Sequence, residues 1–158
     1  MQLEGFDHIT FPVPDLESSE RWYCDVLKGR VVMRQGWDQR DVRVKRTRQI
    51  WIQVGKDVIN LAEGPSLGRQ DDNHFYHYAL RGHIEDLDAW LDHLGKHGVE
   101  VMGPFGHGGS NVLSIYFDDS DNYRLEISFQ CADFETAKKE AMKRGGKLGN
   151  PVASYEWE

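Results

Sequence analysis

Apolar and polar residues alternate in several short segments of the chain. In the segment "NYRLEISFQ", residues 122–130, Leu125, Ile127 and Phe129 alternate with polar neighbours. This period of two predicts a strand with one buried face, and it leaves Glu126 on the opposite face. The same alternation appears in "FDHITFPV" (6–13), "YHYAL" (76–80) and "LSIYF" (113–117), so we expect strands there as well.

Two segments instead have the spacing of an amphipathic helix. Their apolar residues recur at three- and four-residue intervals, which gives a single buried stripe in each. The stripes consist of Trp22, Tyr23, Val26 and Leu27 in the first segment, and of Leu87, Trp90, Leu91 and Leu94 in the second. Gly29 and Gly98 follow at the positions where a left-handed residue commonly ends a helix.

These elements occur twice in the same order. His8 and His77 are 69 positions apart, as are Gly29 and Gly98, and such a constant offset indicates one supersecondary unit used twice. After the first helix we expect strands within 29–35, 41–47, 49–55 and 57–64. The segment 41–47, with Arg43 and Lys45 on one face, is expected to be a charged edge strand or to hold an anionic group.

The order of elements predicts an α+β fold. Each copy has the order βαβββ, and we expect the two tandem modules to form a curved, mixed-sheet cup. Module one covers about residues 5–63, a polar linker 64–73, and module two about residues 74–130. A helix over 133–144 and a tail complete the single domain at 131–158.

Composition excludes several classes of protein. The net charge of −7 argues against a nucleic-acid binder and against binding to an anionic membrane surface. The start has no pattern of a secretory signal, and no apolar run is long enough to span a membrane, so a cytoplasmic protein is expected. Cys24 and Cys131 are expected to be reduced there. The five Trp and six Tyr suit a well-packed core or a site for a small organic molecule.

Candidate chemistry lies on the polar faces of the predicted strands. His8, His77, Tyr116 and Glu126 all fall opposite the apolar set, which must pack against the helices. Two imidazoles and one carboxylate form a ligand set that a divalent first-row metal accepts in a site with open positions. We therefore predict that His8, His77 and Glu126 bind one metal ion, with Tyr116 close by.

At this point the residues resemble the vicinal oxygen chelate superfamily, which includes glyoxalase I, type I extradiol dioxygenases, fosfomycin-resistance enzymes and bleomycin-resistance proteins. The resemblance covers residues 5 to about 130. It depends on "DHITFPVPDLESSERWYCDVL", "HYAL…DLDAWLDHLGKHGVEVMGP" and "SIYFDDSDNYRLEIS". It implies metal positions at His8, Asn60, His77 and Glu126. Because Asn is a poor ligand, three protein ligands are expected, which argues against a glyoxalase I reaction.

The resemblance favours an extradiol dioxygenase that cleaves a catechol-like diol with O₂, using Fe(II) or Mn(II), with Zn, Ni, Co or Mg as other options. His107 and Tyr116 lie 19 and 10 positions before Glu126, as in that group. They are predicted to be catalytic, and Thr10, Asn60 and Ser114 to contact the substrate. The acid–base His of that group could only be His74, whose spacing from His77 places it on the opposite strand face.

Two alternatives remain open. A fosfomycin-resistance enzyme would open an epoxide by hydrolysis or by thiol transfer. The segment "KRTRQIWIQ" lacks the Glu that the hydrolase branch keeps there, and "ISFQCADFET" lacks the Arg of the transferase branch. The second alternative to extradiol cleavage is a metal-free protein that binds a drug. In each case the partner is a small organic molecule, and a homodimer is expected.

Overall fold

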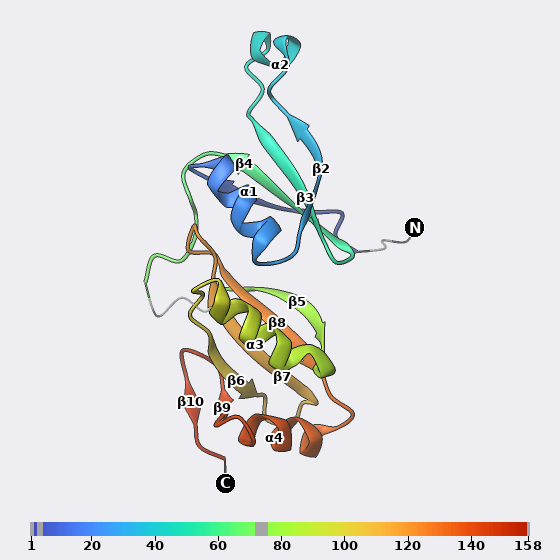
Figure 1. The fold of residues 1–158 in the computed structure, drawn as a ribbon, viewed down its shortest axis with the longest axis vertical. Helices are drawn as coiled ribbons and strands as arrows, with labels where there is room; N and C mark the ends of the chain where they lie inside the picture. The colour runs from blue at the N-terminus through green and yellow to red at the C-terminus, as the bar shows by residue number, and fades with distance from the viewer. Residues whose placement is uncertain (1, 3–4, 72–75, 158) are drawn as a thin grey trace. The chain divides into compact units, whose positions relative to one another are not determined.

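A computed structural model describes residues 2, 5–71 and 76–157. The predicted α+β fold is confirmed, and the βαβββ order occurs twice along the chain (Figure 1). The chain divides into two compact units, Met1–Gly68 and Arg69–Glu158. The boundary falls inside the polar segment 64–73.

The first unit contains one four-stranded sheet and the helix α1. Its strands are β1 (Ile9–Val13), β2 (Arg30–Gln35), β3 (Gln49–Val54) and β4 (Asp57–Glu63), in the spatial order β1-β4-β3-β2. The strands β1 and β4 are parallel, whereas the other neighbours are antiparallel. The helix α1 (Leu16–Asp25) is capped at its N-terminus by Asp15, whose carboxylate accepts a hydrogen bond from the Ser18 amide at 2.9 Å.

Period-two burial gives the first sheet one apolar face, which packs against α1. The fully buried side chains on this face include Phe11, Val13, Ile50, Ile52 and Leu61, and Tyr23 and Leu16 meet them from the helix. The residues between them, among them Thr10, Trp51 and Asn60, lie on the face away from α1. The alternation of the sequence therefore decides which side chains can form a site.

The end of α1 differs from the prediction at one residue. Gly29 was expected to be left-handed, but Lys28 has the positive φ of 55° instead. Gly29 is needed for a different reason, since a Cβ there would lie 2.6 Å from Ile52 Cγ2 and 2.9 Å from the Tyr23 carbonyl. The close approach of the chain to β3 requires glycine at this position. In the second unit, Gly98 has φ of 69°, as predicted.

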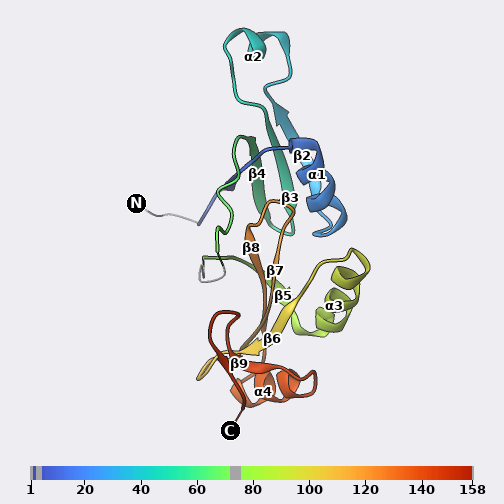
Figure 2. The same ribbon diagram turned by 90° about the vertical axis from the view of Figure 1, so that its left-hand side faces the viewer.

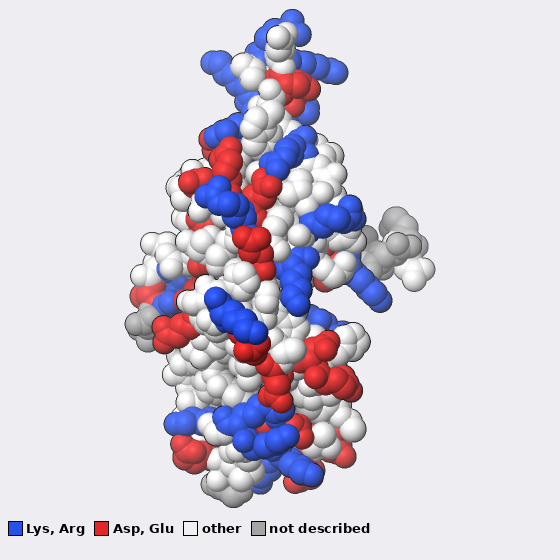
Figure 3. All heavy atoms as spheres, viewed as in Figure 1, with Lys and Arg blue, Asp and Glu red and all other residues white. Residues whose placement is uncertain are grey.

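The prediction of a strand at 41–47 is wrong. This segment contains the short helix α2 (Gln39–Arg43) and a turn in which Lys45 has φ of 52°. Asp38 caps α2 by accepting from the Asp41 amide, and the buried Asp41 carboxylate accepts from the Gly36 amide at 2.8 Å. Val42 and Val44 alternate as in a strand, yet both are exposed, so no core holds them in extended form. Lys and Arg side chains gather around α2 in Figure 3.

The second unit contains a six-stranded sheet in the order β10-β9-β6-β7-β8-β5, whose strands are labelled in Figure 1 and seen from another side in Figure 2. Its strands are β5 (Tyr78–His83), β6 (Met102–Gly106), β7 (Val112–Asp118), β8 (Arg124–Gln130), β9 (Lys147–Gly149) and β10 (Ser154–Tyr155). A 3-10 turn, η1 (Ile84–Asp86), leads into α3 (Leu87–Lys96). Like β1 and β4 in the first unit, β5 and β8 are parallel, so the two modules share one topology.

The C-terminal segment extends the second sheet. The predicted C-terminal helix is α4 (Phe134–Met142), capped by Asp133, and it packs on β6 and β7 through Ala137 and Ala141. The strand β9 then pairs in parallel with β6, and β10 pairs with β9. The Trp157 indole lies against the backbone of Gly106, and its Nε1 donates to the Gly146 carbonyl at 2.9 Å. The tail therefore folds onto the edge of module two.

A partly buried ion cluster fixes the turn between β7 and β8. The Asp118 carboxylate accepts from Arg124 Nε at 2.7 Å and from Arg69 Nη2 at 2.6 Å, and the Arg69 amide donates to the Asn122 carbonyl. Burial opposes ionisation of Asp118, but hydrogen bonds from Arg124 and Arg69 outweigh it and lower its pKa. The cluster attaches the first residues of the unit to the turn that precedes Glu126.

Within the described residues both cysteines are free thiols, and burial raises the pKa of each. No helix in this part of the chain has the length and apolar character needed to cross a membrane.

Candidate metal and substrate site

Two of the three predicted metal ligands meet in the second unit. His77 lies just before β5, and Glu126 lies in the middle of β8, where Ala79 is its partner in the parallel register. Two positions separate His77 from Ala79, so both point to the side of the sheet that carries Glu126. His77 Nε2 and Glu126 Oε2 are 2.8 Å apart, and the Glu126 side chain is only 7% exposed. The sheet thus presents a nitrogen and an oxygen donor at a common point.

Ser114 fixes the other oxygen of the Glu126 carboxylate. Its Oγ donates to Glu126 Oε1 at 2.6 Å, and His107 Nε2 lies 3.0 Å from the same Oγ. Ser114 is fully buried on β7. It lies on the same face of the sheet as Glu126, because its register partner Ser128 is two positions from Glu126 on β8. Ser114 was predicted to contact the substrate, whereas its hydroxyl here connects His107 to Glu126.

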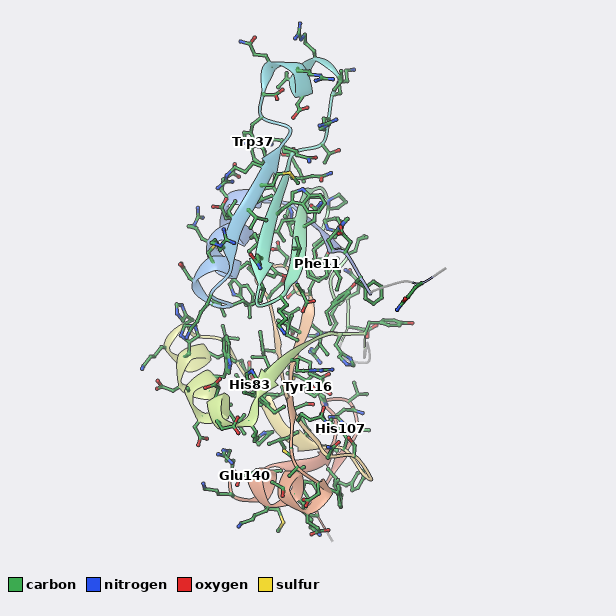
Figure 4. All side chains as sticks on the ribbon, turned by 90° about the vertical axis from the view of Figure 1, so that its right-hand side faces the viewer. Phe11, Trp37, His83, His107, Tyr116 and Glu140 are labelled. Carbon is green, nitrogen blue, oxygen red and sulfur yellow. The ribbon has the colours of Figure 1, made fainter. Side chains whose placement is uncertain are left out.

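The hydrogen bonds define the tautomer of His107. The single Ser114 hydroxyl proton is used in the bond to Glu126, so Oγ accepts a hydrogen bond from the His107 Nε2–H group. Burial lowers the pKa of His107, which favours the neutral ring at neutral pH. His107 directly follows β6, beyond the end of that strand (Figure 4). The neutral ring therefore donates through Nε2 and keeps Nδ1 as an acceptor.

Tyr116 is the third group around the pair. Its ring packs edge-on against His77, with 5.4 Å between the ring centroids, and its side chain is almost fully buried. Burial, followed by the charge of Glu126, strongly raises the pKa of the phenol. Tyr116 therefore keeps its proton throughout the working pH range and can act as a hydrogen-bond donor.

The first unit carries the remaining predicted residues. His8 precedes β1, its Nδ1 lies 2.8 Å from the exposed Asp7 carboxylate, and its ring contacts Trp51 at 4.5 Å between centroids. Asp7 orients the imidazole and leaves Nε2 available, as carboxylates do for metal-binding His. Thr10 is exposed, whereas Asn60 is 3% exposed and donates to Gln49 Oε1 at 3.0 Å.

The donor set fits a divalent cation. His77 and Glu126 converge, Ser114 orients the carboxylate, and imidazole with carboxylate suits first-row metals. Among the described residues, no three His, Cys, Asp or Glu side chains gather in one place. His8 belongs to the first unit, and His77 and Glu126 belong to the second. His74 lies outside the described residues.

Sequence reasoning missed two features of these faces. Trp51 lies beside His8 and Asn60. The only sequence signal for this was the alternation in its strand, which places Trp51 on the face opposite the apolar residues. The Asp118–Arg124–Arg69 cluster was also not foreseen, although Arg124 shares a strand face with Glu126. In both cases the sequence signal was period two along a strand that was already recognised.

Solved structures share this fold. A mutant of fosfomycin resistance protein FosX from Listeria monocytogenes, complexed with Mn(II) and 1S,2S-dihydroxypropylphosphonic acid, matches with a TM-score of 0.67 and 22% identity over 87% of this chain and 99% of that one. FosX from Mesorhizobium loti matches with a TM-score of 0.61 and 23% identity over 85% and 96% of the two chains. These likenesses show the fold.

Curated relatives and a family model extend the comparison to sequence. Metallothiol transferase FosB of Staphylococcus epidermidis is 27% identical over 128 residues, 80% of this chain and 82% of the relative. Fosfomycin resistance protein FosX of Mesorhizobium japonicum is 27% identical over 125 residues, 79% and 85% of the two chains. A model of the glyoxalase/bleomycin resistance protein/dioxygenase superfamily matches residues 5–127. The chain belongs to this superfamily.

Proposed function

We propose that the protein is a divalent-metal-dependent enzyme that opens a small epoxide of the fosfomycin type. The observation that carries this proposal is the convergence of His77 and Glu126 at 2.8 Å on one sheet face. The relatives named FosB and FosX favour this reaction over the extradiol cleavage predicted from the sequence. The Mn(II) named with FosX favours that ion over Fe(II).

His8, His77 and Glu126 would hold the cation. When bound, it would act as a Lewis acid on the oxirane oxygen and favour opening of the ring. Tyr116, which keeps its proton, would donate a hydrogen bond to the negative charge that develops on the substrate. Ser114 and His107 would keep the Glu126 carboxylate in one orientation.

The nucleophile is either water or a thiol. The residues that mark the hydrolase and transferase branches are missing from 45–53 and 127–136, so the site itself does not favour one branch. A direct assay distinguishes them. Fosfomycin would be incubated with the Mn(II)-loaded protein, alone or with cysteine, glutathione or bacillithiol, and its phosphorus resonance would be followed by NMR.

The proposal expects about one equivalent of metal per chain and loss of the fosfomycin resonance under one of these conditions. His77→Ala should lose both metal and turnover, whereas His97→Ala, a change at the exposed end of α3, should keep both. Full metal binding without turnover of fosfomycin under any condition would contradict epoxide opening of this type. Metal-free protein that still binds fosfomycin tightly would favour the drug-binding reading.

Extradiol cleavage stays a second candidate because of His107. Its link through Ser114 to Glu126 gives the face a neutral imidazole suited to proton transfer. Oxygen uptake by the Fe(II)-loaded protein with a panel of catechols would support this reaction. No uptake with a fully Fe(II)-loaded sample would exclude it for those substrates.

We also propose a homodimer, and variant mixing can test how His8 joins the other two ligands. His8→Ala and His77→Ala would each be inactive alone. If His8 acts with the His77 and Glu126 of a second copy, mixed dimers contain one complete set of ligands and regain activity. If all three ligands come from one copy, mixing restores nothing.

A further inference from the structure

Two cross-strand partners on the face of the first sheet that faces away from α1 each carry a buried polar atom without a hydrogen-bond partner among the described residues. Trp51 and Asn60 are direct partners in the register of β3 and β4. Trp51 Nε1 and Asn60 Oδ1 are both buried, and neither has a hydrogen-bond partner among the described residues. Asn60 is only 3% exposed. Its side-chain nitrogen donates a hydrogen bond to Gln49 Oε1, but its side-chain oxygen accepts none from the described residues.

Such groups are costly to bury without partners. A lost hydrogen bond at a buried donor or acceptor costs free energy, so most buried polar atoms in proteins are paired. An unpaired donor and an unpaired acceptor on paired residues of one sheet face indicate a position that a bound group completes. This position adjoins His8, because the His8 ring contacts Trp51.

We propose that Trp51 Nε1 and Asn60 Oδ1 form a subsite for a hydroxyl group of the substrate or product. A hydroxyl can accept from the indole N–H and donate to the amide oxygen at the same time. A fully ionised phosphonate or carboxylate oxygen can only accept, so it would satisfy Trp51 and repel Asn60 Oδ1. This inference rests on the proposed function, in which an epoxide opens to a hydroxyl-bearing product, and it assigns the hydroxyl end of that product.

The residues around the pair agree with this chemistry. Thr10 is the partner of Asn60 on the other side, and Met33 is the partner of Trp51 at the edge strand. The row Thr10–Asn60–Trp51–Met33 therefore contains no charged side chain. A neutral hydroxyl suits this row better than an anion, because nothing in it would neutralise a negative charge.

The test compares two probes on the Mg(II)-loaded protein. These are 1S,2S-dihydroxypropylphosphonic acid and propylphosphonic acid, which lacks both hydroxyls. Trp51→Phe keeps a ring but removes the N–H, and Asn60→Leu removes the amide at similar size. Each variant should bind the diol about tenfold more weakly than the wild type, as measured by calorimetry. Each should change the affinity for propylphosphonic acid less than twofold.

A second readout reports the subsite without turnover. The Trp51 indole N–H resonance, assigned by its absence in Trp51→Phe, should shift when the diol is added and stay in place with propylphosphonic acid. A resonance that shifts although no epoxide is consumed supports the subsite and counts against the proposed function. Epoxide turnover with an unchanged resonance and unchanged diol affinity in both variants overturns the subsite alone. Equal weakening of both probes also overturns it, because general damage to the sheet would do the same.

Discussion

Ser114 Oγ donates to Glu126 Oε1 over 2.6 Å, and both side chains are buried on neighbouring antiparallel strands. The bond is accepted by Oε1, whereas His77 lies next to Oε2. Ser114 therefore orients the carboxylate without occupying the oxygen that faces His77. The metal-binding geometry proposed for Glu126 therefore depends on a residue that need not touch the metal or the substrate. This relationship gives the first prediction.

Ser114→Ala is expected to weaken metal affinity by about 10- to 100-fold, because the carboxylate loses the donor that orients it. Titration with Mn(II), followed by calorimetry or electron paramagnetic resonance, measures the change. Ser128→Ala is the matched control, since Ser128 is the β8 partner of Ser114 in the register. Equal metal affinity in the two variants would contradict the role given to Ser114.

His107 should make stability depend on pH. Burial lowers its pKa in the folded state, so the unfolded chain binds this proton more readily. Stability is therefore full above the unfolded-state pKa of about 6.5 and falls as the pH drops toward the folded-state pKa. His107→Gln should lose less stability than the wild type between pH 7.5 and pH 5.

Urea denaturation of the metal-free protein at the two pH values checks this prediction. His97→Gln, on the exposed end of α3, is the matched control and should behave like the wild type. The idea fails if His107→Gln and wild type lose equal stability over this range.

Asp118→Asn is expected to destabilise the second unit by about 2–3 kcal/mol, because the buried Arg124 and the half-buried Arg69 would lose their shared counter-charge. Asp92→Asn, which breaks the exposed pair with Lys96, should cost less than about 0.5 kcal/mol. Denaturant unfolding of both variants at pH 7.5 gives the comparison. A cost for Asp118→Asn as small as that for Asp92→Asn would show that the cluster is not stabilising.

Gly106 and Trp157 should be coupled energetically. A Cβ at Gly106 would meet the Trp157 ring, so Gly106→Ala should displace the tail and expose the backbone that leads to His107. Trp157→Ala should have a similar effect, each costing about 2 kcal/mol. In the double variant the alanine has room, so the costs should not add, with an interaction energy of about 1 kcal/mol or more. Additive costs in the unfolding measurements would argue against the contact.

The fold followed from the sequence wherever an apolar pattern had something to pack against. The stripes of α1 and α3 and the alternation in β7 and β8 all end in buried side chains such as Tyr23, Leu94 and Phe117. The pattern failed at 41–47, where Val42 and Val44 alternate but are exposed, and where Asp38 and Asp41 supply local bonds that favour a helical turn. Alternation predicts a strand only if a core exists to use it.

The site was predictable only in part, for a similar reason. Strand faces placed His77 and Glu126 together, because period two determines which side of a sheet a residue takes. The partners of Ser114, the tautomer of His107 and the orphaned atoms of Trp51 and Asn60 depend on side-chain rotamers and on the cross-strand register. No local pattern in the sequence encodes these features.

The pairing of β9 with β6 distinguishes the two repeats in one further respect. In the described part of the first unit, the outer ladder of β2 has no such cover, and its amide and carbonyl groups can accept an additional strand. In the second unit the corresponding row is already used, and the margin ends in the two-residue strand β10, which is too short to template another chain. At this edge, an additional strand from another copy can therefore pair with the first repeat but not with the second, so the C-terminal segment makes the two repeats unequal as partners for sheet extension.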